Sequence, residues 1–263
     1  MATALDEVAF LANSENRVAV FEALVEAPRS RDEIRDRIDA SRVTVARILR
    51  ELDERDWVEG SGTEYTVTPL GEWVYDEFSD LLEEVAAERR LRRVLQWMRS
   101  DLLTFDVRCL HDAEVIVLDG SDGTAFIRRV LEFHRSGDRV RGVATMGAPV
   151  FVENHWEMTV QGDTCLEMVL TPAVLELALD QQPSARQFRE MLEEDDVRFY
   201  VDEDVPMSVG IVDGTVGINL TDEQGVVKGG LVTDDETVYE WAVDLFETCR
   251  DRGDPVGPDH VSM

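Results

Sequence analysis

Residues 29–69, RSRDEIRDRIDASRVTVARILRELDERDWVEGSGTEYTVTP, decide the fold of the N-terminal part of the chain. Ser30 and Glu33 have the spacing of a capping box, in which a serine hydroxyl and a glutamate carboxylate each satisfy a backbone amide of the other residue. This spacing predicts that a short helix begins here and runs to about Ile38. A tight turn follows, and Ser41 is placed to cap a second helix.

The second predicted helix, residues 41–55, has two different faces. Apolar side chains recur at steps of three and four residues, which is the spacing of a buried helix face. These side chains are Val45, Ile48, Leu49 and Leu52. The opposite face carries Val43, Ala46, Arg47 and Arg50, with Arg42 and Thr44 on its flanks. We therefore expect one face to lie in a core and the arginine face to meet solvent.

Two short strands follow this helix. Residues 57–59 and 64–67 read as strands on either side of the glycine-rich segment 60–63, and this arrangement predicts a β-hairpin. Helix, tight turn, helix and glycine-tipped hairpin together resemble the winged helix-turn-helix of bacterial and archaeal transcription regulators. The resemblance rests on residues 41–52, 57–59 and 65–71, and it covers about the first third of the chain.

The resemblance implies sequence-specific binding to double-stranded DNA, with the second helix in the major groove. Arginine is suited to this role because it forms paired hydrogen bonds with guanine and also contacts phosphate. The residues expected at the DNA are Arg31, Arg35, Ser41, Arg42, Thr44, Arg47, Arg50, Thr63 and Tyr65. The alternative for this surface is a solvated helix face paired with Glu51, Asp53 and Glu54.

The charge of the chain is strongly acidic, with a formal net charge of −30 from 56 acidic and 26 basic residues. Lys228 is the single lysine, and this acidic, lysine-poor composition indicates adaptation to a high-salt cytoplasm. High salt screens long-range repulsion, so the acid excess argues little against DNA binding where a local basic patch exists. Residues 37–50 supply such a patch, because they hold four arginines and one aspartate.

Several kinds of site are not expected. The longest apolar runs are too short for a membrane span, and the N-terminus lacks the pattern of a signal peptide, so we expect a cytoplasmic protein without membrane partners. Cys109, Cys165 and Cys249 are widely spaced, which argues against a disulfide framework and a zinc site. Because the histidines also lack metal-ligand spacing, we expect no metal and no cofactor.

Residues 70–99 read as a linker or dimerisation helix. Its apolar stripe is wider than a coiled-coil seam requires. The stripe consists of Leu70, Trp73, Val74, Phe78, Leu81, Leu82 and Val85. Two interpretations remain open: the stripe pairs two subunits in a homodimer, or it packs inside one chain.

Residues 100–251 alternate predicted strands and helices, then show closely spaced strands and a closing helix, which indicates an α/β domain with a mixed sheet. The run 113–118 has the texture of a buried parallel strand, residues 147–162 remain unassigned, and Asp213-Gly214 predicts a hairpin. Residues 252–263 are expected to form a flexible tail. The predicted fold class is α+β: residues 1–69 form the winged helix-turn-helix, which a long helix joins to the α/β domain.

The second region resembles the effector domains of archaeal winged-helix regulators: most closely those of the methanogen filament regulators, more distantly the phospholipase-D-like unit of the sugar-sensing maltose-operon regulators. The residues that carry this resemblance lie in 208–214, 228–235 and 238–247. It implies a regulatory domain that senses a small effector or a partner. The candidate effector-binding residues are Asp119, Ser121, Thr124, Thr145, His155 and Asp213.

Two other functions are considered beside the regulator. One is an α/β enzyme of phosphodiesterase or transferase type with an accessory winged helix. A phospholipase-D-type enzyme needs histidine and lysine two residues apart, whereas His111 is followed by Asp112 and Ala113, so no catalytic residues are predicted. The other is a winged helix used for protein–protein contacts alone.

Overall fold

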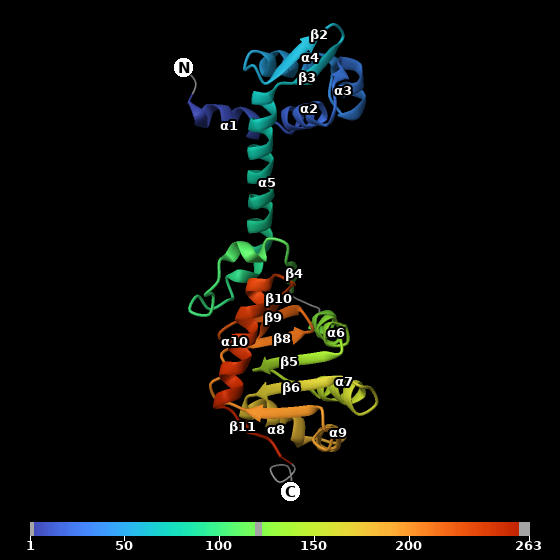
Figure 1. Cartoon of the computed structure of the whole chain (residues 1–263), viewed down its shortest axis with the longest axis vertical. Helices are drawn as coiled ribbons and strands as arrows, with labels where there is room; N and C mark the ends of the chain where they lie inside the picture. The colour runs from blue at the N-terminus through green and yellow to red at the C-terminus, as the bar shows by residue number, and fades with distance from the viewer. Residues whose placement is uncertain (1–2, 119–122, 258–263) are drawn as a thin grey trace. The chain divides into compact units, whose positions relative to one another are not determined.

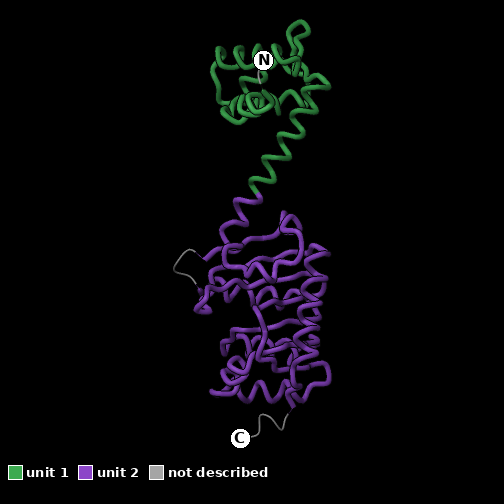
Figure 2. Tube along the Cα trace, turned by 90° about the vertical axis from the view of Figure 1, so that its left-hand side faces the viewer, with its two compact units in different colours: residues 1–86 green, residues 87–263 purple. Residues whose placement is uncertain are grey.

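The computed structural model describes residues 3–118 and 123–257, which divide into two compact units (Figures 1 and 2). The first unit ends at Ala86 and the second begins at Ala87, so the division falls inside helix α5 (Pro69–Leu95). Each unit has its own hydrophobic core. Among the residues described, no helix has both the length and the apolar character that a membrane crossing requires.

Unit 1 packs short helices around a small sheet. Its helices are α1 (Ala4–Ala12), α2 (Glu15–Glu26), α3 (Arg31–Arg37), α4 (Arg42–Asp53) and the first part of α5. Its strands are β1 (Arg29–Ser30), β2 (Val58–Ser61) and β3 (Glu64–Val67), in the order β1-β3-β2. The expected capping box at Ser30 and Glu33 is present, and Ser41 caps α4 as the sequence predicts.

The apolar face of α4 lies in the core of unit 1. Val45, Ile48, Leu49 and Leu52 are all buried, together with Phe21 of α2 and Ile34 of α3. The hairpin of β2 and β3 closes with residues Gly62 and Thr63, and Gly62 has a φ of 65°, which glycine adopts without strain. Strand β1, which the sequence did not reveal, pairs with β3 and leads directly into α3.

Unit 2 is built on a mixed sheet, eight-stranded within the described residues, in the order β11-β7-β6-β5-β8-β9-β10-β4 (Figure 1). Strands β5, β6 and β7 are parallel neighbours, and the other neighbours pair antiparallel. The strands are β4 (Glu114–Val117), β5 (Arg139–Ala144), β6 (Cys165–Leu170), β7 (Val197–Val201), β8 (Ser208–Val212), β9 (Thr215–Thr221), β10 (Val227–Thr233) and β11 (Asp254–Pro255). The helices are α6 (Gly123–His134), α7 (Pro149–Thr159), α8 (Pro172–Asp180), α9 (Ser184–Met191), α10 (Glu236–Arg252) and the 3-10 turn η1 (Val107–Leu110).

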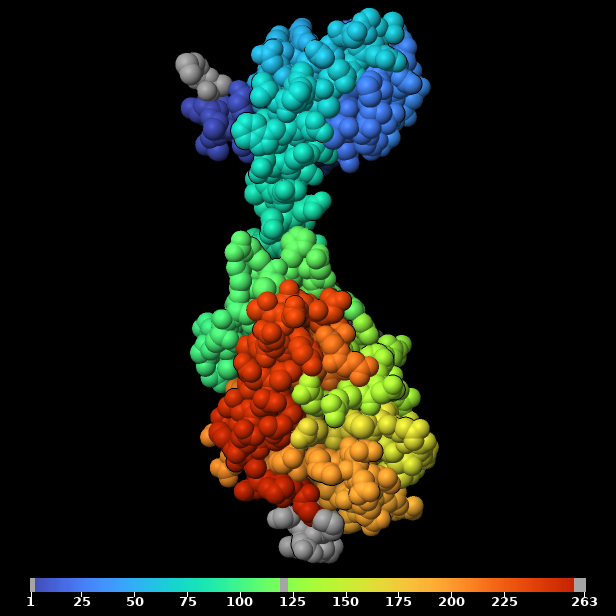
Figure 3. Space-filling model, in the orientation of Figure 1, coloured from blue at the N-terminus to red at the C-terminus, as the bar shows by residue number. Residues whose placement is uncertain are grey.

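Both faces of this sheet are covered. On β6, Leu166, Met168 and Leu170 belong to the core cluster shared with α7, α8 and α9, whereas Val169 points into the cluster shared with α10. Side chains of α10 form a continuous surface along one side of the unit (Figure 3). Two covered faces explain why the strands read as nearly continuous apolar runs. The predicted fold class, a winged helix joined by a long helix to an α/β domain with a mixed sheet, is confirmed.

Three local expectations need correction or completion. The run 113–118 is not a parallel central strand: β4 lies at the edge of the sheet and pairs antiparallel with β10. It reads as apolar because Val115 and Val117 pack on the core cluster that includes α10. The unassigned segment 147–162 contains α7. The segment 252–263, expected as a flexible tail, begins with the end of α10 and with β11, which pairs with β7; residues 258–263 lie outside the described residues.

The start of α5 predicts a measurable sensitivity. A side-chain carbon added at Gly71 would overlap the backbone carbonyl of Trp57, so Gly71→Ala must displace the helix from the hairpin. We expect it to lower the free energy of unfolding by about 1–3 kcal/mol, the range of overpacked cores. Gly214→Ala, where the added carbon meets open space, is the matched control and should change stability by less than about 1 kcal/mol. Urea unfolding at constant molar salt, followed by tryptophan fluorescence, measures both; equal effects would contradict the prediction.

Candidate functional site

The outward face of α4 is the first candidate site. The Ser41 hydroxyl accepts a hydrogen bond from the Thr44 amide at 3.1 Å and shares another with the Thr44 hydroxyl at 2.9 Å, so these two residues form the N-terminal cap. The next two side chains project into solvent, with an exposed fraction of 74% for Arg42 and 79% for Val43. The face therefore presents arginine, threonine and valine on a rigid helix.

The predicted arginines of this face are ion-paired within the chain. Arg47 contacts Glu51 at 2.8 Å, and Arg50 contacts Glu54 at 3.6 Å. Glu51 and Glu54 are two of the three acidic partners that the alternative interpretation, a solvated helix face, predicts for these arginines. Exposed pairs of this kind contribute little to stability because both ions remain hydrated, so a phosphate can replace the carboxylate.

Arg42 joins α4 to α3. Its guanidinium lies 3.0 Å from a carboxylate oxygen of Asp32, which Arg35 also contacts at 2.8 Å. The hydrogen bond from Arg42, followed by the charges of Arg35 and Arg42, holds the pKa of Asp32 below its usual value. Asp36, through a hydrogen bond and its charge, raises the pKa of Arg35. Two predicted contact residues therefore share one small charge cluster.

The wing joins the same surface through Tyr65. Arg31 Nε donates to the Tyr65 hydroxyl at 2.9 Å, and the guanidinium lies 5.2 Å from the ring centroid. Thr63 stands exposed in the hairpin loop. The structure thus distributes the predicted DNA-contacting residues over three elements of unit 1: α3, α4 with its cap, and the wing.

Val43 is a further exposed side chain of this face that the sequence-based set of contacts did not include. It is the most exposed large apolar side chain among the described residues. The available signal was a β-branched apolar residue on the polar face of the helix, next to Arg42 and Thr44. Side chains of this kind can contact the methyl group of thymine in the major groove.

The predicted effector-binding residues do not form one site. Asp119 and Ser121 lie outside the described residues, and Thr124 is exposed in the first turn of α6. The Asp213 carboxylate accepts from the backbone amide of Arg139 at 3.1 Å and so fastens the β8–β9 turn to β5. Thr145 and His155 are the remaining members.

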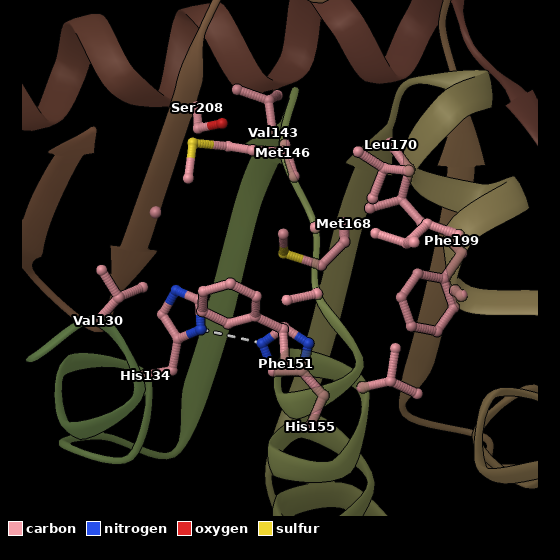
Figure 4. Close-up of a pocket in the computed structure, with 18 of the residues that line it drawn as sticks. Val130, His134, Val143, Met146, Phe151, His155, Met168, Leu170, Phe199 and Ser208 are labelled. Carbon is pink, nitrogen blue, oxygen red and sulfur yellow. Dashed lines mark hydrogen bonds between the residues drawn. The ribbon is translucent and has the colours of Figure 1, made fainter. Parts of the chain in front are cut away.

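His155 lies at a cavity in unit 2, between the sheet and helices α6 to α9 (Figure 4), and Thr145 is linked to this cavity through Ser208. His155 lines it directly, while the Thr145 amide and hydroxyl bind the lining residue Ser208, at 2.9 Å and 3.0 Å. The cavity has a volume of about 80 Å³. Apolar side chains dominate its wall, among them Val130, Met146, Phe151, Met168, Leu170 and Phe199.

A buried histidine pair, His134 of α6 and His155 of α7, forms the polar part of this wall. His134 Nδ1 and His155 Nε2 are 2.9 Å apart and the rings stack at 5.0 Å (Figure 4). Burial lowers the pKa of His134 to about 4. Burial, and after it the charge of His134, lowers the pKa of His155 to about 3. Both imidazoles are therefore neutral at neutral pH.

Burial is the main cause that keeps these imidazoles neutral. Arg135, the charged residue next to His134, is turned to Asn154 and Glu157 of α7, with which it forms short polar contacts. Across the described part of the chain, no group of three or more His, Cys, Asp or Glu side chains is arranged to hold a metal ion. The histidine pair forms a hydrogen bond in the cavity wall. It could not be recognised in the sequence because the two residues are 21 positions apart.

Two family models match the chain. The model described as HVO_A0261 N-terminal domain matches residues 5–90, and that of the middle domain of methanogenesis regulatory protein FilR1 matches residues 124–252. The second match agrees with the resemblance of this region to the methanogen filament regulators that the sequence predicted. The more distant link to the maltose-operon regulators stays a prediction. A search of curated proteins gives no match.

Solved structures show weaker likeness. TrmBL2, an archaeal chromatin protein, has a TM-score of 0.43 and 15% identity, over 95% of this chain and 99% of its own. Nuc, a phospholipase D family member from Salmonella typhimurium, has a TM-score of 0.42 and 15% identity, over 55% and 99%. A MarR/EmrR family regulator from Acinetobacter has a TM-score of 0.26 and 21% identity, over 37% and 79%. At these scores the structures carry no functional argument.

The histidine pair predicts a pH dependence of stability. Unfolded histidines titrate near pH 6.5, so between that pH and about 4 the unfolded chain binds more protons than the folded chain, and stability falls as pH falls. The double variant H134Q/H155Q should therefore lose less stability than the parent between pH 7 and pH 5. Urea unfolding at both pH values in constant molar salt measures the difference. Equal losses in the parent and the variant would show that the pair is not held neutral.

Proposed function

We propose that the chain is a sequence-specific DNA-binding transcription regulator whose second unit senses a small effector or a partner. The observation that carries this proposal is the exposed arginine face of α4, held outward by a buried apolar face in a winged helix. The match of residues 124–252 to the middle domain of a methanogenesis regulator supports a regulatory role for unit 2.

In this proposal α4 enters the major groove. Arg47 and Arg50 can form paired hydrogen bonds with guanine, and Ser41 and Thr44 lie at the end of the helix that meets the backbone. Arg31 and Arg35 of α3, with Thr63 and Tyr65 of the wing, would contact phosphates. Arg35, Arg47 and Arg50 each leave an intramolecular carboxylate when they bind, so DNA exchanges one ionic partner for another.

We propose in addition that two chains assemble through α5. The apolar stripe of this helix divides: Phe78 is buried in the core of unit 1, and Val74 packs against that core. The rest of the stripe is exposed: Leu70, Trp73, Leu81, Leu82 and Val85. An exposed apolar set on one helix is typical of an interface, and a two-fold dimer suits a palindromic site.

Arg47→Ala tests the DNA-binding face. The full chain, incubated with a random pool of duplex DNA in molar KCl, should enrich one sequence motif. On that motif the variant should lose roughly 1–3 kcal/mol of binding free energy, the loss of a paired base contact. Quantitative footprinting measures it.

The matched control is Arg92→Ala, because Arg92 also forms an exposed pair with a glutamate one helical turn away, Glu88, but on α5. It should leave the affinity unchanged. If no motif is enriched while the protein stays folded, the winged helix does not read DNA sequence and a role in protein contacts takes its place.

The dimer predicts a dependence on salt. At −30 per chain, two subunits repel each other unless ions screen the charge, and the screening length is about 3 Å at 1 M salt. We therefore expect a dimer in molar salt that dissociates as salt is removed. Leu81→Asp and Val85→Asp should weaken it further because each places a carboxylate in the apolar stripe. Sedimentation equilibrium across a salt series is the measurement, and a monomer at every salt concentration would overturn the dimer.

A further inference from the structure

The cavity of unit 2 has the composition of a ligand site. Five adjacent strands, β7-β6-β5-β8-β9, supply one wall, through residues such as Val143 of β5, Met168 of β6 and Val209 of β8. Helices α6 to α9 supply the other, with Phe151 of α7 and Val174 of α8 among the lining residues. Ligand sites typically combine an apolar wall of this kind with a few placed polar groups.

Glycine makes room for one of those polar groups. Gly210 of β8 lines the cavity, and a side-chain carbon there would lie 3.2 Å from His134 Nε2. A glycine inside a strand marks a place where another group approaches the backbone closely. The sheet therefore leaves space for the imidazole of His134, which then reaches His155.

The histidine pair keeps two nitrogens for another partner. In the described residues, neither His134 Nε2 nor His155 Nδ1 has a recorded hydrogen bond. Among the described residues, Gln187 Oε1 is the one fully buried side-chain nitrogen or oxygen that has no hydrogen-bond partner. The two outer histidine nitrogens are not in that class, so each keeps some accessible surface. Whichever imidazole donates the internal bond, the two outer nitrogens present one donor and one acceptor.

The rest of the lining decides the charge of the ligand. Among the described residues that line the cavity there is no Asp, Glu, Lys or Arg. Besides the two histidines, the polar side chains of the lining are Ser208 and Asn219. An ion would enter this wall without an opposite charge, which is unfavourable. At roughly 10–15 Å³ for each water-sized unit, the volume suits a molecule of about five to eight non-hydrogen atoms.

We propose that this cavity binds a small, neutral, mainly apolar molecule that carries one hydroxyl or carbonyl group, and that the outer nitrogens of His134 and His155 hold that group. A hydroxyl can meet either outer nitrogen, since it both donates and accepts, and a carbonyl meets the donor. The role of this molecule as an effector rests on the proposed function, whereas its binding does not.

Isothermal titration of the full chain in molar KCl tests the site with four probes: phenol, cyclohexanone, toluene and benzoate. Phenol and cyclohexanone should bind. Toluene, which has the shape of phenol without the hydroxyl, should bind about tenfold more weakly, the effect of one hydrogen bond to a buried partner. Benzoate should not bind. Equal affinity for phenol and toluene, preference for benzoate, or failure of both phenol and cyclohexanone would overturn the proposal.

Two variants locate the binding. H134F/H155F keeps the rings and removes their nitrogens, so the affinity for phenol should fall to that for toluene. Should this variant not fold, Ala178→Leu, which adds volume to the cavity wall, should abolish binding of every probe. His111→Phe, outside the cavity lining, is the control and should leave phenol binding unchanged. Phenol binding that survives both cavity variants would place the site elsewhere.

Both experiments use the full chain, so their results can be compared to test the cavity site and the DNA-binding function separately. Motif enrichment from duplex DNA without binding of phenol or cyclohexanone would overturn the cavity site and leave the DNA-binding function. Phenol binding without motif enrichment would do the reverse. Where both occur, saturating phenol should change the affinity for the motif if the cavity is the effector site.

Discussion

Burial of one face of α4 is the constraint on which unit 1 depends. Val45, Ile48, Leu49 and Leu52 are almost completely removed from water, and each buried aliphatic side chain contributes about 1.5–3 kcal/mol. Rotation of the helix by even a quarter turn would expose part of this face. The opposite face is therefore fixed as the solvent face without any interaction of its own, and the arginines there can keep weak partners because the core alone orients them.

Unit 2 follows a different constraint, since its sheet has to be covered on both faces. Helix α10 covers one face, and the other face carries four shorter helices. The cavity lies between these shorter helices and the sheet, where residues of β5 to β9 line it. The histidine pair joins α6 to α7 across it, so a ligand there would act on the contact between two helices.

Local signals explain what could be predicted from the sequence. The caps at Ser30 and Ser41, the apolar stripe of α4 and the glycine of the wing each operate within a few residues, so the winged helix could be assigned from a short stretch. The position of β4 at the sheet edge could not, because an edge strand that packs on a core reads like a central one. The histidine pair could not be predicted from the sequence either, because only the fold brings α6 and α7 together.

The acidity of the chain shapes how such a surface would meet DNA. In an ordinary basic protein, arginines that bind phosphates release the cations condensed on DNA, and affinity falls steeply with salt. Here Arg42, Arg47 and Arg50 already hold carboxylates, which must attract cations of their own once the arginines leave. Cations released from the DNA are partly recaptured by the protein, so the net release for each contact is smaller. If unit 1 binds DNA as proposed, intramolecular pairing would therefore make that binding less sensitive to salt.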